Sequence, residues 1–324
     1  MKRRELMLLL LFPLLALSMP IDAQGADEKL YRLGQLALTT QSIAITRSTT
    51  LPELAKLGFI EGRNLVLDER VGDRASMPGL ARTMVLGNPD AIIAVGIDAV
   101  RAAHEATRTV PILAFGPDLV QAGLAASLAR PGGNITGVQI FATELDGKRL
   151  DLLLEAVPAV RRMAALLLPS MPGREVSERE MRSVVANRGV ELIVVEAAES
   201  GDYPAAFVAM RSAGAQALII QANPVFYRDA STLAGLALKA GLPTVCEWAD
   251  MVQSGFLLGY GPSRSEMRRR LAHQVARIFR GAAPSDLPIE QPTQFEMAVN
   301  VKTAEALGLT ISQSLLARAD EVIQ

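Results

Sequence analysis

The apolar residues of this chain fall into short runs that recur at regular intervals along most of its length. The runs are continuous rather than alternating, which is typical of parallel strands covered on both faces of a sheet. We therefore expect strands at residues 31–38, 64–70, 90–96, 111–116, 135–139, 162–168, 191–196, 217–222, 243–247 and 256–260.

Amphipathic helical patterns separate several of these runs. Residues 145–157 carry leucines at helical spacing among charged residues, and Pro158 ends the pattern. Residues 264–280 place apolar residues on one face and a run of arginines elsewhere, which we interpret as a solvated helix face. Alternation of strands and helices predicts an α/β fold with right-handed crossovers and parallel sheets, and this many strands suits two sheets of about five better than one.

A Pro131-Gly132-Gly133-Asn134 turn marks the clearest break between two lobes. We expect a helix over 121–129 to end before it, because proline cannot continue a helix and glycine permits a positive φ. The strand from Ile135 is then expected to cross to the second lobe. A second crossing is expected near 259–262, with the following helix packing back on the first lobe, and residues 291–300 read as a third.

The N-terminus has the order of a secretory signal peptide: a basic start, an apolar run over 6–17 and then small residues. The apolar run is shorter than the roughly 20 residues that span a bilayer. We expect residues 1–23 to be cleaved after Ala23, with Ser18 and Ala26 as alternative sites. An uncleaved membrane anchor is the competing interpretation. Cleavage would make the protein periplasmic, with no stable membrane insertion.

Charge and cysteine content narrow the class of protein further. Residues 1–23 carry three positive and two negative charges, so the formal net charge of −1 becomes −2 in the mature chain. Such a chain has no electrostatic attraction for nucleic acid or anionic lipid. Cys246 is the only cysteine, so no internal disulfide can form, and a chain of this size can bury enough apolar surface without one.

Residues that would support catalysis are sparse. His104 and His273 lie in predicted helices without partners at metal-ligand spacing, and no nucleophile elbow, Walker loop or zinc-protease helix occurs. Gly132-Gly133-Asn134 precedes a strand instead of following one, so it is no dinucleotide fingerprint. Cys246 reads as an inert buried thiol. We expect no catalytic residue, metal or cofactor, which favours binding over catalysis.

Ligand sites of open α/β sheets form at the carboxyl ends of the strands. Asp98 there would begin a helix whose N–H groups could hold a carboxylate, although it could simply cap that helix. Asn223 could be an ordinary helix entry, and Trp248, the sole tryptophan, could stack on a ligand or belong to the core. The predicted ligand-binding residues are Thr39, Thr40, Gly96, Ile97, Asp98, Phe115, Asp118, Ser170, Asn223, Trp248 and Tyr260.

Six segments in a fixed order resemble the family of ABC-transporter substrate-binding proteins described as tryptophan/tyrosine transport components. They are residues 57–65, 123–137, 145–150, 291–296, 300–309 and 314–322. The resemblance implies a type I periplasmic binding protein fold, with two Rossmann-like lobes, three hinge crossings and a ligand caught by closure. It also implies delivery to an inner-membrane permease and ATPase. Gly96–Ala99 stands where the family has Gly-Thr-Pro-Ala, and Gly116–Leu119 where it has Gly-Asp-Pro-Val.

The pattern and the resemblance together predict a monomeric, extracytoplasmic substrate-binding protein of an ABC importer. Its ligand would be a small organic solute, either an amino acid or an aromatic-like compound. A periplasmic ligand-sensing subunit for a membrane receptor is the alternative, and an enzyme on a Rossmann-like fold is a weaker one. The expected division is a signal peptide over 1–23, lobe 1 over 29–138 plus 262–287, and lobe 2 over 139–261 plus 288–324.

Overall fold

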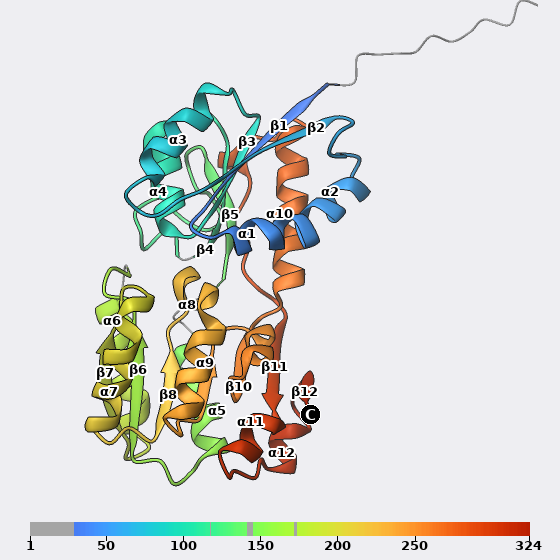
Figure 1. Cartoon of the computed structure of the whole chain (residues 1–324). Helices are drawn as coiled ribbons and strands as arrows, with labels where there is room; N and C mark the ends of the chain where they lie inside the picture. Colours follow the sequence, from blue (N-terminus) through green and yellow to red (C-terminus); the bar gives the residue numbers. More distant parts are fainter. Residues whose placement is uncertain (1–28, 117, 141–144, 172–173) are drawn as a thin grey trace, which may run out of the picture.

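The computed structural model describes residues 29–116, 118–140, 145–171 and 174–324, which form two α/β lobes (Figure 1). Each lobe is built around its own sheet, as the spacing of the apolar runs predicts. Within these ranges, no helix is both long enough and apolar enough to span a membrane.

The first lobe contains a parallel five-stranded sheet in the order β2-β1-β3-β4-β5. Helices α3 and α4 cover one face, and α2 and α10 cover the other (Figure 1). The strands are β1 (Tyr31–Ala37), β2 (Leu65–Val71), β3 (Ala91–Val95), β4 (Ile112–Gly116) and β5 (Ile135–Gln139). The helices are α1 (Thr40–Ile45), the π-helical turn η1 (Thr46–Thr50), α2 (Leu51–Lys56), α3 (Met77–Leu86), α4 (Ile97–Ala106), α10 (Arg264–Phe279) and η4 (Pro284–Asp286).

The second lobe contains a seven-stranded sheet in the order β12-β11-β10-β9-β8-β6-β7. Its pairs are parallel except for β10 and β11, which run antiparallel. The strands are β6 (Arg162–Leu167), β7 (Glu191–Glu196), β8 (Ala217–Ile220), β9 (Thr244–Cys246), β10 (Leu258–Pro262), β11 (Phe295–Asn300) and β12 (Glu321–Ile323). The helices are α5 (Asp146–Ala156), α6 (Arg174–Ala186), η2 (Ser200–Asp202), α7 (Tyr203–Ser212), α8 (Pro224–Arg228), α9 (Ala230–Lys239), η3 (Ala249–Ser254), α11 (Val301–Ala306) and α12 (Gln313–Leu316).

The chain passes between the lobes in three places. It leaves the first sheet after β5 and reaches α5, with residues 141–144 outside the described ranges. It returns after β10, and α10 packs its apolar face on the first lobe, as predicted. The last passage follows Glu290, whose backbone N–H donates to Gly137 at 2.9 Å, a few residues beyond the expected boundary at 287.

The Pro131–Asn134 turn is not a hinge. It lies within the first lobe, at the amino end of β5, because the Asn134 amide donates to the Val110 carbonyl at 2.8 Å and to the Thr107 carbonyl at 3.2 Å. β5 itself pairs with β4 and does not cross. At Gly137 a side chain would collide with the backbone of the neighbouring strand, so glycine here permits the close pairing.

The expected helix over 121–129 is also absent, and turns occupy this segment. Asp118 accepts the backbone N–H groups of Val120 and Gln121 at 2.8 and 3.0 Å, which starts a helix-like turn. Gly123 then adopts φ +71°, and this left-handed conformation ends the turn after one cycle. The leucine and alanine pattern alone cannot reveal this interruption.

A buried ion pair lies in the second lobe where α5 meets the end of β10. Arg149 on α5 is 1% exposed and contacts Asp146 at 2.8 Å. Its Nε donates to the backbone carbonyl of Tyr260 at 2.8 Å, near the end of β10. Asp146 also accepts a hydrogen bond from Ser177 at 3.0 Å. The resemblance segment 145–150 therefore holds the start of α5 against the end of β10.

We expect Arg149→Met to lower the free energy of unfolding by about 3–5 kcal/mol, because it leaves Asp146 buried without its cation. Urea denaturation followed by circular dichroism measures this change. Arg188→Met is the control. It breaks the exposed ion pair of Arg188 with Asp151, a residue of α5 like Arg149, and should lower the free energy of unfolding by about 1 kcal/mol or less. Equal losses in the two variants would contradict a special role for the buried pair.

Candidate functional site

A cleft of about 850 Å³ lies between the lobes, at the carboxyl ends of strands from both sheets. The first lobe contributes residues that end or follow β3 and β4, such as Gly96 and Phe115. The second lobe contributes residues that follow β6, β8 and β9, such as Ser170, Asn223 and Glu247. The cleft therefore forms where the topology of parallel sheets places ligand sites.

Most of the predicted ligand-binding residues line this cleft. They are Gly96, Ile97, Asp98, Phe115, Ser170, Asn223 and Trp248. Gly96 has φ +86° and stands as the N-cap of α4, with no side chain capping the helix. Asp98 is therefore not the cap, and it forms an ion pair with Arg74 at 2.8 Å. Asn223 does cap its helix, because its side chain accepts the N–H of Phe226 at 2.9 Å.

The other predicted residues lie away from the described wall of the cleft. Thr39 is buried as the N-cap of α1, and Thr40 is exposed on that helix. Asp118 is used by its own turn. Tyr260 stacks on Phe295, with ring centroids 6.2 Å apart, and packs against a core cluster of the second lobe. A position at or after a strand end does not by itself direct a side chain into the cleft.

Two cleft residues, Arg264 and Arg268, lie on α10, and Arg268 belongs to the arginine run interpreted from the sequence pattern as a solvated face. That interpretation is wrong for Arg268, which is 3% exposed. Arg268 lies three residues before Leu271 and seven before Val275, which is the spacing of the apolar stripe. This spacing is the sequence signal that could have identified it.

The Arg268 guanidinium is held by two contacts. It lies over the Phe115 ring, 3.9 Å from the centroid, and Nη1 donates to Thr46 Oγ1 at 3.1 Å. Its Nε has no hydrogen-bond partner among the described residues. Burial, with a smaller contribution from the Arg264 charge, lowers the pKa of Arg268 to about 9, so the side chain is still largely cationic at neutral pH.

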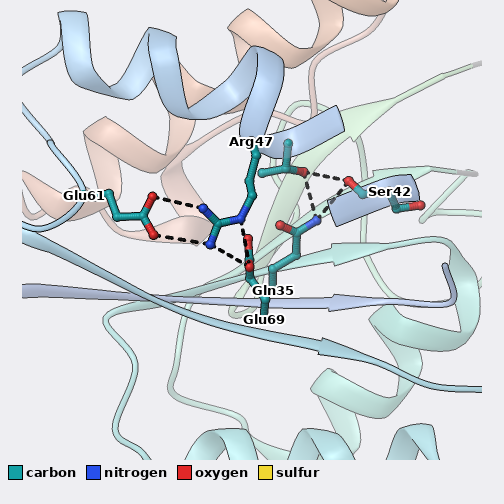
Figure 2. Close-up of polar contacts among 6 residues, drawn as sticks. Gln35, Ser42, Arg47, Glu61 and Glu69 are labelled. Carbon is teal, nitrogen blue, oxygen red and sulfur yellow. Dashed lines mark hydrogen bonds and ion pairs between the residues drawn. The ribbon is translucent and has the colours of Figure 1, made fainter. Parts of the chain in front are cut away.

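The Thr46 hydroxyl is held in place by Gln35 of β1 and by the Ser42 carbonyl of α1. Its Oγ1 accepts from Gln35 Nε2 at 2.9 Å and donates to the Ser42 carbonyl at 3.2 Å. Figure 2 shows Gln35 beside Arg47, with its amide hydrogen-bonded toward Ser42. Arg47 in turn contacts Glu61 at 3.1 Å and Glu69 at 2.8 Å, which ties η1 to β2 and its preceding loop.

On the second lobe, Glu247 and Trp248 follow β9 directly. Glu247 is 5% exposed, and desolvation raises the pKa of its carboxyl to about 8, despite the opposing charge of Arg149. Any side chain at Gly261 on β10 would collide with the Glu247 carbonyl, so this glycine permits the close approach of the two segments.

Trp248 is mostly buried in the core of the second lobe but still contributes to the cleft wall. The Arg264 guanidinium lies 5.6 Å from its ring centroid and 4.6 Å from that of Tyr227. Arg264 also pairs with Asp250 at 2.9 Å. Trp248 thus belongs to the core and also lines the cleft, beside Tyr227 and the Arg264 guanidinium.

Chemically, the cleft combines apolar walls with a few charged groups and suits a small solute that has an apolar body. Among the described residues, no group of histidine, cysteine, aspartate and glutamate side chains is arranged to hold a metal ion. Cys246 is fully buried, and burial raises the pKa of its thiol well above the usual range.

The two lobes and the cleft between them have the type I periplasmic binding protein fold. The model of the family described as "ABC transporter substrate binding protein" matches residues 39–323. The chain therefore belongs to this family.

Relatives of known name or structure agree with this assignment. A protein from Clostridioides difficile named "Tyrosine-binding protein" is 22% identical over 283 residues, which cover 83% of this chain and 81% of that protein. A conserved domain protein from Vibrio cholerae has a TM-score of 0.84 at 24% identity, covering 91% of this chain and 99% of its own. An ABC domain from Streptococcus pneumoniae, solved with L-Trp, has a TM-score of 0.84 at 20% identity, covering 91% and 100%.

The raised pKa of Glu247 predicts a pH-dependent stability. The folded protein holds a proton on this carboxyl up to about pH 8, whereas the unfolded chain releases it near 4.5, so stability falls as pH rises through that window. Glu247→Gln should remove this pH dependence. As pH increases, the free energy of unfolding of the variant relative to wild type should therefore rise, by at most about 1.4 kcal/mol per pH unit. Urea unfolding at pH 5, 6, 7 and 8 measures the difference, and the exposed Glu305→Gln serves as control. A constant difference between Glu247→Gln and wild type would refute the assignment.

Proposed function

We propose that this protein captures a small organic solute, an amino acid or an aromatic-like compound, for an ABC importer. The observation that carries the proposal is the cleft between the lobes, whose walls come from the strand ends of both sheets. Two relatives are consistent with such a ligand, since one is named for tyrosine binding and one was solved with L-Trp.

Binding would favour the closed arrangement of the lobes. A ligand that contacts both walls gains all of its interactions only when the walls approach each other. The lobes already approach at the rim, where a Cβ placed on Gly96 would lie 3.4 Å from Pro224 of the second lobe. Phe115 and Trp248 would cover the apolar part of the solute from opposite sides.

The role is binding rather than catalysis. The family is one of substrate-binding proteins and a structural neighbour was solved with L-Trp, which supports this assignment. A sensory subunit would use the same closure to signal to a receptor, but membership of an ABC transporter family favours the transport role. The remaining parts of the proposal are an inner-membrane permease as partner, a monomeric state, and a periplasmic location after removal of residues 1–23.

Trp248 provides a direct readout of ligand capture, because it is the only tryptophan and lies on the cleft wall. A thermal-shift screen of amino acids, aromatic acids, sugars, polyols, amines and nucleosides should show at least one stabilising solute. That solute should change the Trp248 emission, Trp248→Phe should lose the signal, and Trp248→Ala should weaken binding at least several-fold. If no solute raises the unfolding temperature, the proposed function is wrong.

Export predicts a processed N-terminus. When residues 1–324 are expressed in a Gram-negative host, the mature protein should be found in the periplasm and should begin at Gln24. Intact-mass spectrometry of the osmotic-shock fraction measures this. Leu10→Arg should keep the protein unprocessed and cytoplasmic, because a charge interrupts the apolar run. Full-length protein retained in the membrane fraction would favour an uncleaved anchor.

A further inference from the structure

We propose that the solute carries a carboxylate and that Arg268 is the residue that binds it. This inference rests on the proposed function and specifies the chemistry of the same cleft. The side chain lines the cleft, is almost completely buried and forms no ion pair with any carboxylate among the described residues. A buried cation without a counter-ion is costly, so its presence in a binding cleft points to a partner supplied from outside.

The other arginines that line the cleft differ from Arg268 in this respect. Arg74 pairs with Asp98, Arg228 with Asp229 and Arg264 with Asp250, at distances of 2.7–2.9 Å. Their charges are therefore already compensated within the protein. Among the described residues, the Arg268 guanidinium contacts the Phe115 ring and the Thr46 hydroxyl, and its buried Nε–H has no hydrogen-bond partner.

The guanidinium is also oriented in advance. Thr46 Oγ1 accepts from both Gln35 and Arg268 while it donates its own proton to the Ser42 carbonyl, so its hydrogen-bonding capacity is fully used. The Phe115 ring packs against one face of the planar Arg268 guanidinium and so fixes the orientation of that plane. A ligand carboxylate would then meet a rigid donor group, which reduces the entropic cost of binding.

The charge pattern of the cleft favours a singly charged carboxylate over a phosphate. Glu199 and Asp73 also line the cleft, and their carboxylates would repel a second negative charge on the ligand. The rest of the wall is largely apolar and would contact the body of the solute; it includes Ile97, Phe115, Leu168, Met171, Val225 and Trp248. The expected ligand class is therefore a small carboxylic or amino acid with an apolar body.

A first experiment uses the unmodified protein and matched probes. Calorimetry compares 3-phenylpropanoate and L-phenylalanine with 3-phenylpropanamide, 2-phenylethylamine and phenyl phosphate, alongside the solute screen described above. We expect the tightest-binding solutes to carry a carboxylate, and the amide to bind at least tenfold more weakly than the matching acid. A neutral or cationic probe that binds as tightly as the acids, or phenyl phosphate that does so, would overturn the inference while leaving the proposed function intact.

A second experiment tests the residue. Arg268→Met should weaken carboxylate binding at least tenfold, while the urea midpoint of the ligand-free protein stays the same or rises, because an uncompensated buried charge has been removed. Arg269→Met, one residue further along α10 and exposed, should change neither quantity. Unchanged carboxylate affinity in Arg268→Met would exclude Arg268 as the anchor.

The two failures can be told apart. If no solute of any class binds the wild type, the proposed function fails together with the inference. If Arg268→Met does not fold, Thr46→Val tests the same geometry, because it removes the acceptor that orients Nη1 without altering a residue of the described cleft wall. It should weaken carboxylates several-fold and leave any neutral ligand unaffected, and an equal effect on both would contradict the inference.

Discussion

The buried contact of Arg149 with Asp146 is the interaction that holds the start of α5 against the end of β10, the two elements that lie next to the first and second passages between the lobes. Asp146 begins α5, directly after the first passage between lobes, and Arg149 also binds the Tyr260 carbonyl just before the second. The end of β10 is thereby fixed where the chain turns into α10. From there α10 carries Arg264 and Arg268 to the cleft, and its apolar face packs on the first lobe.

Much of the fold could be predicted from the sequence because helices cover both faces of the sheets, so the strands are continuous apolar runs. In a chain whose apolar runs alternate with helices, a continuous apolar run such as Ile92–Ala94 indicates a buried parallel strand. The failures come from local signals that tertiary context overrides. The Pro131–Asn134 turn has the chemistry of a junction, but turn chemistry cannot say whether the next strand changes sheet. Segment 145–150 is rich in charge and looks exposed, although Arg149 is among the most buried side chains.

The site was predictable to the extent that topology determines it. Residues after β3, β4, β6, β8 and β9 line the cleft because the carboxyl ends of parallel strands face the same way. Two kinds of error remained. Tyr260 lies on a strand that pairs antiparallel with β11, and it packs against the core and Phe295. Arg268 comes from a helix, and its burial depends on packing against the first sheet, which no local pattern encodes beyond its place in the apolar stripe.

The energetics of the cleft link ligand capture to closure. Arg268 belongs to the wall of the first lobe and Glu247 to that of the second, and burial shifts the pKa of each toward its neutral form. When the lobes separate, water can solvate both groups. Closure without a ligand would remove that water and leave two polar groups uncompensated, at a cost of several kcal/mol for an unpaired charge. On the proposed function, a ligand that supplies a carboxylate would remove most of that penalty for Arg268, and its binding would favour the closed state.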